Sequence, residues 1–137
     1  MSSEPSIFER IMAGDIPSEM VHEDDHAIVI QDINPQAPIH LLIIPRIKIP
    51  RLADAEVQHQ AVLGHLMLLA GQMAEKMGCA DAFRIVINNG AEAGQTVFHL
   101  HLHLLAQKRF DEGALACLLY TSPSPRDATL SRMPSSA

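Results

Sequence analysis

Three histidines alternate with leucines in the run His99-Leu100-His101-Leu102-His103. Side chains along a β-strand point alternately to its two faces, so the imidazoles would share one face and the leucines the opposite, buried face. Three imidazoles this close together cannot all be charged at low cost, so some must stay neutral and hydrogen-bonded near pH 7. A neutral imidazole offers one acceptor nitrogen, which can attack phosphorus, bind a metal ion or accept a proton.

This histidine cluster has three interpretations. It can be a half-exposed polar face without function, although chance seldom places three histidines at a period of two. It can bind zinc, but a catalytic zinc has three protein ligands, and no cysteine, aspartate or glutamate stands at a suitable spacing. It can also supply a nucleophile with acid–base partners, which suits phosphoryl or nucleotidyl transfer through a covalent histidine intermediate. We favour the nucleophile, and therefore predict neither a metal ion nor a cofactor.

The elements that must position these histidines follow from hydrophobic periodicity and turn residues. A short helix is predicted after the capping box formed by Ser6 and Glu9, and Gly14 ends it. A long helix is predicted from its N-cap Asp54 to Met77. Apolar or alternating runs bounded by turn formers predict strands at 19–23, 26–31, 39–44, 83–87 and 96–105. Short connections without a βαβ repeat predict an α+β domain with an antiparallel sheet.

Composition argues against several classes of protein. The 137 residues suit one domain, and a net charge of -6 at pH 7 argues against a nucleic-acid partner, which needs a basic surface. No apolar run approaches the ~20 residues of a membrane span, and residues 1–8 lack the features of a secretory signal. The two cysteines show no disulfide or metal-ligand spacing. We therefore expect a soluble cytoplasmic protein that binds neither nucleic acid nor membranes.

Residues 117–137 differ in composition from the rest of the chain. They are rich in serine and proline and contain none of the eight histidines. Such a composition is typical of a disordered tail. Its back-translation, however, resembles a sequencing-library adapter interrupted by an index, so we interpret the segment as adapter-derived and not native. The expected domain is then residues 1–116, shortened at its own C-terminal end.

On these motifs the sequence resembles the histidine triad (HIT) family, whose signature H-x-H-x-H-x-x, with x apolar, is matched by residues 99–105. The resemblance extends over about residues 5–106. It implies the HIT-like fold, an antiparallel five-stranded sheet with one long and one short helix, assembled as a homodimer. Further segments resemble the Hint branch of this family, the purine nucleoside phosphoramidases: 7–8, 14–17, 23–25, 32–38 and 94–95.

The resemblance implies a hydrolase of purine nucleoside 5′-phosphoramidates. His101 would attack the α-phosphorus, release the amine and form a nucleotidyl-histidine, which water would hydrolyse to the nucleoside monophosphate. His99 and His103 would hold the phosphate oxygens, orient His101 and relay protons, with the acid and base roles left open between them. Two alternatives stay open: a dinucleoside polyphosphate hydrolase of the same family, and a non-enzymatic module that binds nucleotides or zinc.

The resemblance also implies residues that bind the substrate. The phosphate or leaving group would be bound by Asn88, Gln95 and Thr96, which could equally be ordinary loop residues. Asp32 would bind the ribose hydroxyls, and its alternative role is to cap a turn. The purine would lie in an apolar slot whose members could equally be simple core: Ile7, Phe8, Ile11, Ile30 and Ile33.

The chain departs from the family pattern at two places. Lys48 stands where many members carry a further histidine, and Ala-Gln-Lys at 106–108 replaces a Gly-Gly-Arg that follows the triad in many Hint proteins. In a homodimer, apolar side chains on the long helix such as Leu68 and Leu69 could form the interface or could be core. The remaining histidines are taken as ordinary: His22, His26, His40, His59 and His65.

Overall fold

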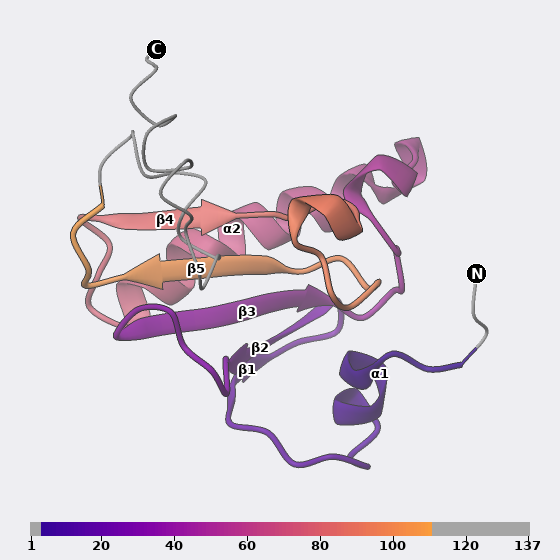
Figure 1. Ribbon diagram of the computed structural model, residues 1–137, viewed down its shortest axis with the longest axis horizontal. Coiled ribbons are helices and arrows are strands. Elements are labelled where there is room, and N and C mark those ends of the chain that lie inside the picture. Colours follow the sequence, from indigo (N-terminus) through magenta and orange to yellow (C-terminus); the bar gives the residue numbers. More distant parts are fainter. Residues whose placement is uncertain (1–3, 111–137) are drawn as a thin grey trace. The chain divides into compact units, whose positions relative to one another are not determined.

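Five strands form one antiparallel sheet with the order β1-β2-β3-β5-β4 (Figure 1). The computed structural model describes residues 4–110 of the chain. The pairings between neighbouring strands are all antiparallel, which confirms the α+β class predicted from the sequence. The first four strands agree with their predicted ranges to within one residue. The strands are β1 Met20–Glu23, β2 Ala27–Gln31, β3 Ile39–Pro45, β4 Phe83–Val86 and β5 Leu102–Ala106.

The chain divides into two units near the end of the described range. Met1–Gln107 forms one compact unit, and Lys108 begins the second. The predicted domain boundary at residue 116 and the segment 117–137 lie outside the described residues. Among residues 4–110, no helix combines the length and the apolar character needed to cross a bilayer.

Helix α1 (Ile7–Met12) begins at the capping box expected from the sequence. The Ser6 hydroxyl accepts a hydrogen bond from Glu9 N–H at 3.1 Å, and the Glu9 carboxylate accepts one from Ser6 N–H at 2.9 Å. These bonds satisfy two backbone donors that the start of a helix otherwise leaves unpaired. Gly14, just beyond the helix, has a φ of +85°, a conformation that glycine adopts without steric cost.

Helix α2 (Gln60–Lys76) begins later than the predicted N-cap Asp54. The Asp54 carboxylate does not cap it, because its two oxygens accept hydrogen bonds from the Arg51 guanidinium at 2.8 and 2.9 Å. Two single 3-10 turns, Leu52–Asp54 and Val57–His59, lie before the helix. The prediction of Asp54 as N-cap is therefore wrong.

Both faces of the sheet are covered, at least in part, by a helix. Helix α2 packs on one face, running behind β4 and β5 in Figure 1, and contributes Leu66, Leu69 and Met73 to the larger core. Because side chains alternate along β3, His40 and the residues that follow it at intervals of two lie on the opposite face. There α1 covers a smaller cluster: Phe8, Ile28, Ile30, Leu42 and Ile44.

Strand β5 begins at Leu102, not at residue 96 as predicted. Its ladder with β3 ends at the pair Ile43 and Leu102, and before that point the backbone bonds elsewhere, with Leu100 N–H donating to Ile49 O at 2.7 Å. Of the three histidines, only His103 lies within the strand, so the prediction that one strand carries all three is wrong. The rings still lie together, because Phe8 contacts those of His99 and His101, and the centroid of His101 is 5.1 Å from that of His103. The leucines still enter the larger core, as their alternation predicted: Leu100, Leu102 and Leu104.

Candidate active site

His99 is fully buried, and both of its ring nitrogens have partners. Nε2 lies 2.8 Å from Pro45 O, and Nδ1 lies 2.8 Å from Ser6 Oγ. A carbonyl oxygen only accepts, so Nε2 carries the hydrogen and Nδ1 accepts from the Ser6 hydroxyl. Burial lowers the pKa of His99, which keeps the ring neutral near pH 7. Neither nitrogen is left for a substrate, so the expected contact of His99 with phosphate oxygens does not fit this geometry.

His101 presents one ring nitrogen with a lone pair. Its Nδ1–H donates to the backbone carbonyl of His99 at 2.8 Å, and a neutral ring protonated there has its lone pair on Nε2. Burial lowers the pKa of His101, so the neutral form prevails near pH 7. The ring packs edge-on against Phe8 with 4.9 Å between centroids, and its centroid lies 5.1 Å from that of His103. Nε2 of His101 is thus the nitrogen best suited to attack.

His103 is oriented by His40, one of the histidines taken as ordinary. The backbone N–H of Gln36 donates to Nδ1 of His40 at 2.9 Å, so the hydrogen of that ring is on Nε2. This Nε2 lies 2.9 Å from Nδ1 of His103 and 3.4 Å from a carboxylate oxygen of Asp32. His103 therefore accepts at Nδ1 and carries its own hydrogen on Nε2. Burial lowers the pKa of His103 to about 3, with a further contribution from nearby His101 and His40.

The position of His40 within an apolar strand could have marked it as a residue that needs a buried hydrogen-bond partner. It is the polar residue in the apolar run of β3, its side chain is buried, and burial lowers its pKa against the opposing charge of Asp32. A buried polar group needs a hydrogen-bond partner. Leu42 faces His103 in the β3–β5 register, so His40 and His103 are diagonal neighbours on one face. The partner could be identified only once the pairing of β3 with β5 was known.

Asp32 faces this pair of histidines from the loop after β2. One of its carboxylate oxygens accepts Asn34 N–H at 2.8 Å and so caps the turn, while the other is the oxygen near His40. The side chain is 19% exposed, which leaves it accessible to a ligand. The two expectations for Asp32, a turn cap and a site residue, are compatible.

Gln95 braces a loop rather than facing the histidines. Its side-chain NH₂ donates to Pro50 O at 2.7 Å and to Val97 O at 3.0 Å, and its carbonyl accepts Gly90 N–H at 2.7 Å. Both of its donors are used within the protein, so the ordinary-loop alternative holds for Gln95.

The other two predicted phosphate residues differ from Gln95 in their surroundings. Asn88 is half-buried, and its side chain lies within 4 Å of where a Cβ on Gly94 would stand. Thr96 is exposed. Their assignment to phosphate binding stays a prediction.

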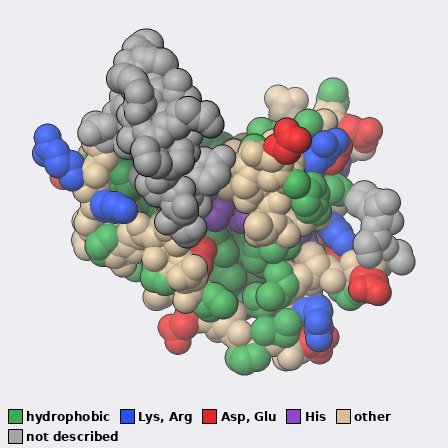
Figure 2. All heavy atoms as spheres, in the orientation of Figure 1, with side chains coloured by type: hydrophobic (Ala, Val, Ile, Leu, Met, Phe, Trp, Pro, Cys, Tyr) green, Lys and Arg blue, Asp and Glu red, His purple; other side chains and the backbone are tan. Residues whose placement is uncertain are grey.

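The predicted purine slot divides into buried and exposed members. Phe8 and Ile30 belong to the core under α1, and Ile11 packs against that core. Ile7 is 45% exposed and Ile33 is 94% exposed, so apolar surface is open to solvent at both. Figure 2 shows histidine side chains at the centre of one face of the molecule, with hydrophobic side chains beside them.

Lys48, at the departure from the family pattern, secures the start of the chain's first helix. Its ammonium group donates to Glu4 O at 2.9 Å and lies 3.6 Å from the Glu9 carboxylate.

The second departure from the family pattern, Ala-Gln-Lys in place of Gly-Gly-Arg, affects the backbone. Gln107 has a φ of +62°, a region of backbone conformation that favours glycine.

Three side chains of the site could act together as metal ligands. Asp32, His40 and His103 each offer one ligand atom, and these atoms all lie within 4.8 Å of one another. Sequence spacing gave no carboxylate ligand for a zinc ion beside the triad, but the fold brings Asp32 to His40 and His103, because residues far apart in sequence meet across the sheet. Two imidazoles and one carboxylate are a ligand set that zinc accepts.

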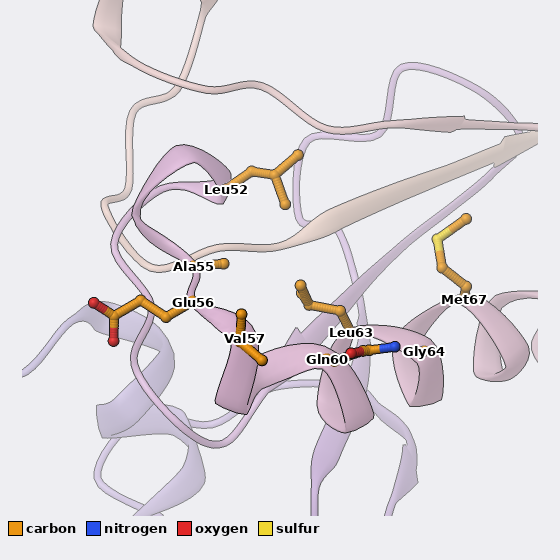
Figure 3. A pocket seen from close by; sticks show the side chains of 8 residues that line it. All are labelled: Leu52, Ala55, Glu56, Val57, Gln60, Leu63, Gly64 and Met67. Carbon is orange, nitrogen blue, oxygen red and sulfur yellow. The ribbon is translucent and has the colours of Figure 1, made fainter.

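A separate groove lies at the start of α2, away from the histidines (Figure 3). It has a volume of about 680 Å³ and an apolar lining interrupted by two polar side chains. None of the triad residues lines it. The lining residues are Leu52, Ala55, Glu56, Val57, Gln60, Leu63, Gly64 and Met67.

The fold and the histidine site define a class of protein, and comparison with known proteins gives the same class. The model of the HIT domain family matches residues 13–110. The chain belongs to this family, as the triad motif predicted.

Individual relatives agree with this assignment. An uncharacterized HIT-like protein of Synechocystis is 50% identical over 108 residues, which cover 79% of this chain and 95% of the relative. The purine nucleoside phosphoramidase of Escherichia coli is 42% identical over 104 residues, 75% of this chain and 87% of the relative. The crystal structure of a HIT family hydrolase from Legionella pneumophila superimposes with a TM-score of 0.77 at 35% identity, covering 79% of this chain and 97% of that protein.

Proposed function

We propose that this chain is a hydrolase that cleaves the P–N bond of purine nucleoside 5′-phosphoramidates. The observation that carries the proposal is the pair of tautomers at its centre: a lone pair on Nε2 of His101 beside an N–H on Nε2 of His103. A nucleophile next to a hydrogen-bond donor suits attack on phosphorus with stabilisation of its oxygens. The similarity to the E. coli purine nucleoside phosphoramidase supports this choice of substrate.

The proposed reaction has two steps. Nε2 of His101 attacks the α-phosphorus, the P–N bond to the amine breaks, and the amine leaves with a proton. Water then attacks the same phosphorus, the bond to Nε2 breaks, and the nucleoside monophosphate is released as the water loses a proton. His103 donates a hydrogen bond from Nε2–H to the departing nitrogen, because both nitrogens of His99 are already engaged. His103 is neutral near pH 7, so the proton that the amine takes up comes from solvent, and the water of the second step returns one proton to solvent.

The surroundings of the histidines suit the remaining parts of a nucleotide. Asp32 can accept hydrogen bonds from ribose hydroxyls through the oxygen that faces His40. The exposed apolar surface of Ile7 and Ile33 suits the flat face of a purine.

The test measures hydrolysis of adenosine 5′-phosphoramidate. Wild type should release AMP, and His101→Ala should lose turnover and the covalent adenylyl-protein that rapid denaturation at alkaline pH and mass spectrometry would detect. His26→Ala is the matched control, because His26 is an exposed histidine outside the site. Equal turnover by wild type and His101→Ala would reject the nucleophile, and faster turnover of diadenosine triphosphate would favour the dinucleoside polyphosphate alternative.

A second candidate function is zinc binding, which the cluster of Asp32, His40 and His103 favours. Zinc held there would occupy the carboxylate that ribose needs and the nitrogens that set the tautomer of His103. Zinc and nucleotide should then compete. Metal analysis of protein purified without a polyhistidine tag, followed by AMP titration with and without zinc, distinguishes a zinc protein from a zinc-inhibited enzyme.

We propose that two copies of the chain associate through the exposed face of α2. Leu68 is 71% exposed and Met67 is 56% exposed, and Met67 also lines the apolar groove. Leu69 is 1% exposed and belongs to the core, which is the second of the two roles that its position in the sequence left open. Sedimentation should give a dimer for wild type and a monomer for Leu68→Glu. A wild-type monomer at micromolar concentration would reject this interface.

A further inference from the structure

We propose that Ser6 is a positioning residue for the nucleophile and acts through His99. This inference rests on the proposed function for its catalytic consequence, although the contact itself does not. Ser6 stands before α1, 93 residues from His99 in sequence, and its hydroxyl oxygen lies 2.8 Å from Nδ1 of that buried ring.

The Ser6 hydroxyl makes two hydrogen bonds of opposite sense. Its oxygen accepts Glu9 N–H at 3.1 Å, as the N-cap of α1. A hydroxyl has one hydrogen and two lone pairs, so its hydrogen is available to Nδ1 of His99. One side chain therefore starts the helix and also fixes the tautomer of His99.

His99 transmits this constraint to His101. With Nδ1 accepting from Ser6, the ring keeps its hydrogen on Nε2, which donates to Pro45 O at the end of β3. The ring is thus held at both edges, between α1 and the sheet. The backbone carbonyl of the same residue accepts Nδ1–H of His101 at 2.8 Å, which is the bond that leaves the lone pair on the attacking nitrogen.

Packing on α1 supports the same link. Phe8, two residues after Ser6, lies edge-on to both rings, with centroids 5.7 Å from His99 and 4.9 Å from His101. Among the ionisable groups near His99, Glu9 favours its cation, whereas His101 and Lys48 oppose it. Loss of the Ser6 bond would release the helix and the ring together, so a test must separate the two.

Four variants separate capping from positioning. Ser6→Thr retains both hydrogen bonds, and Ser6→Ala removes both. Ser6→Asp retains the cap, because a carboxylate accepts Glu9 N–H, but it has no hydrogen to donate to His99. Arg10→Gly weakens α1 at an exposed position and leaves the Ser6 contact intact.

The kinetic expectation is a change in kcat with little change in KM. Ser6→Ala and Ser6→Asp should each lower kcat on adenosine 5′-phosphoramidate by about tenfold, the effect of losing one hydrogen bond that orients a reacting group. Ser6→Thr should stay within about twofold of wild type. Arg10→Gly should retain kcat. If Ser6→Asp matches wild type, or if Arg10→Gly loses as much kcat as Ser6→Ala, the role of Ser6 is confined to capping.

A second measurement does not depend on activity. Nitrogen-15 NMR of the histidine rings should show His99 in wild type as a neutral ring with its hydrogen on Nε2. In Ser6→Asp the carboxylate should draw a second hydrogen onto Nδ1, so that His99 is doubly protonated near pH 7. An unchanged His99 spectrum in Ser6→Asp would overturn the proposal. Absence of phosphoramidate turnover in wild type would overturn the proposed function instead and leave this spectrum as the test of Ser6.

Discussion

Nε2 of His40 lies 2.9 Å from Nδ1 of His103, although 63 positions separate the two residues. The bond joins the second residue of β3 to the second residue of β5 across their shared ladder. It sets which nitrogen of His103 carries a hydrogen. The orientation of Nε2–H of His103 therefore depends on a buried histidine outside the triad.

Replacement of His40 by leucine tests this dependence. His40→Leu leaves Nδ1 of His103 without its donor, so we expect kcat on adenosine 5′-phosphoramidate to fall by about tenfold. His40→Gln should recover part of the loss, because its amide can still donate. The measurement is the single-turnover rate of His101 adenylylation, with thermal unfolding to compare folding. A wild-type rate in folded His40→Leu would contradict the assignment.

The buried histidines make stability depend on pH. Burial lowers the pKa of His99 and His101, and lowers that of His103 to about 3, whereas an unfolded histidine titrates near 6.5. Below pH 6.5 the unfolded chain therefore binds more protons than the folded chain, and the free energy of unfolding falls as the pH drops toward 4. Urea titrations at several pH values should show this decrease. His103→Asn should make it shallower, and an unchanged slope would show that His103 is not held neutral.

A second histidine cluster, on the α2 side of the sheet, depends on one carboxylate. One oxygen of Asp24 accepts hydrogen bonds from Nε2 of His22 at 2.8 Å and of His65 at 2.9 Å. The other accepts the backbone N–H groups of His26 and Ala27. Burial alone would raise the pKa of Asp24, but these hydrogen bonds outweigh it and hold the pKa well below its usual range.

Replacement of Asp24 by asparagine should therefore destabilise the protein. We expect Asp24→Asn to lower the free energy of unfolding by about 1–3 kcal/mol at pH 7, because a charged acceptor of several hydrogen bonds is lost. The neighbouring Asp25→Asn is the matched control, since Asp25 is exposed. Equal urea midpoints for the two variants would show that the cluster contributes nothing to stability.

Gln107 offers a stabilising substitution. Its φ of +62° lies in the left-handed region, where the Cβ of any residue other than glycine crowds the backbone and raises the free energy of the folded state. Gln107→Gly should raise the free energy of unfolding by about 0.5–1 kcal/mol, the balance of relieved strain over the greater freedom of an unfolded glycine. Gln107→Ala keeps the Cβ and should be near neutral. Calorimetry that finds Gln107→Gly less stable than wild type would contradict this account.

Much of the fold could be predicted because its signals are local. The capping box at Ser6 and Glu9 needs only a spacing of three residues, and the apolar runs of β2 and β3 need only their own composition. Asp54 shows where local signals fail. Aspartate is a common N-cap residue, but this carboxylate accepts hydrogen bonds from the guanidinium of Arg51 and does not cap α2. Which of two local partners an aspartate takes depends on the path of the chain, and a pattern of residue types does not determine that path.

The candidate site could be predicted only in part, because several of its contacts join residues that are far apart in sequence. Alternation placed the three leucines in the core, but it could not show that His99 and His101 precede the strand, because that depends on where the β3 ladder ends. Gln95 looked like a phosphate ligand by position, yet its amide is consumed by backbone carbonyls across the loop. His40 acquires its role only through the pairing of β3 with β5.

The proposed nucleophile, His101, is oriented by a peptide carbonyl rather than by a carboxylate. The partner of Nδ1 on His101 is the oxygen of His99, which carries no net charge. Burial lowers the pKa of His101, and an uncharged carbonyl opposes this effect less than a carboxylate in its place would, so the imidazole stays weakly basic. A weakly basic nitrogen departs readily from phosphorus. In the proposed reaction, low basicity makes His101 a weaker nucleophile in the first step. The same property makes it a better leaving group in the second step. The adenylylated protein should then be short-lived, so that turnover does not stall at the covalent stage.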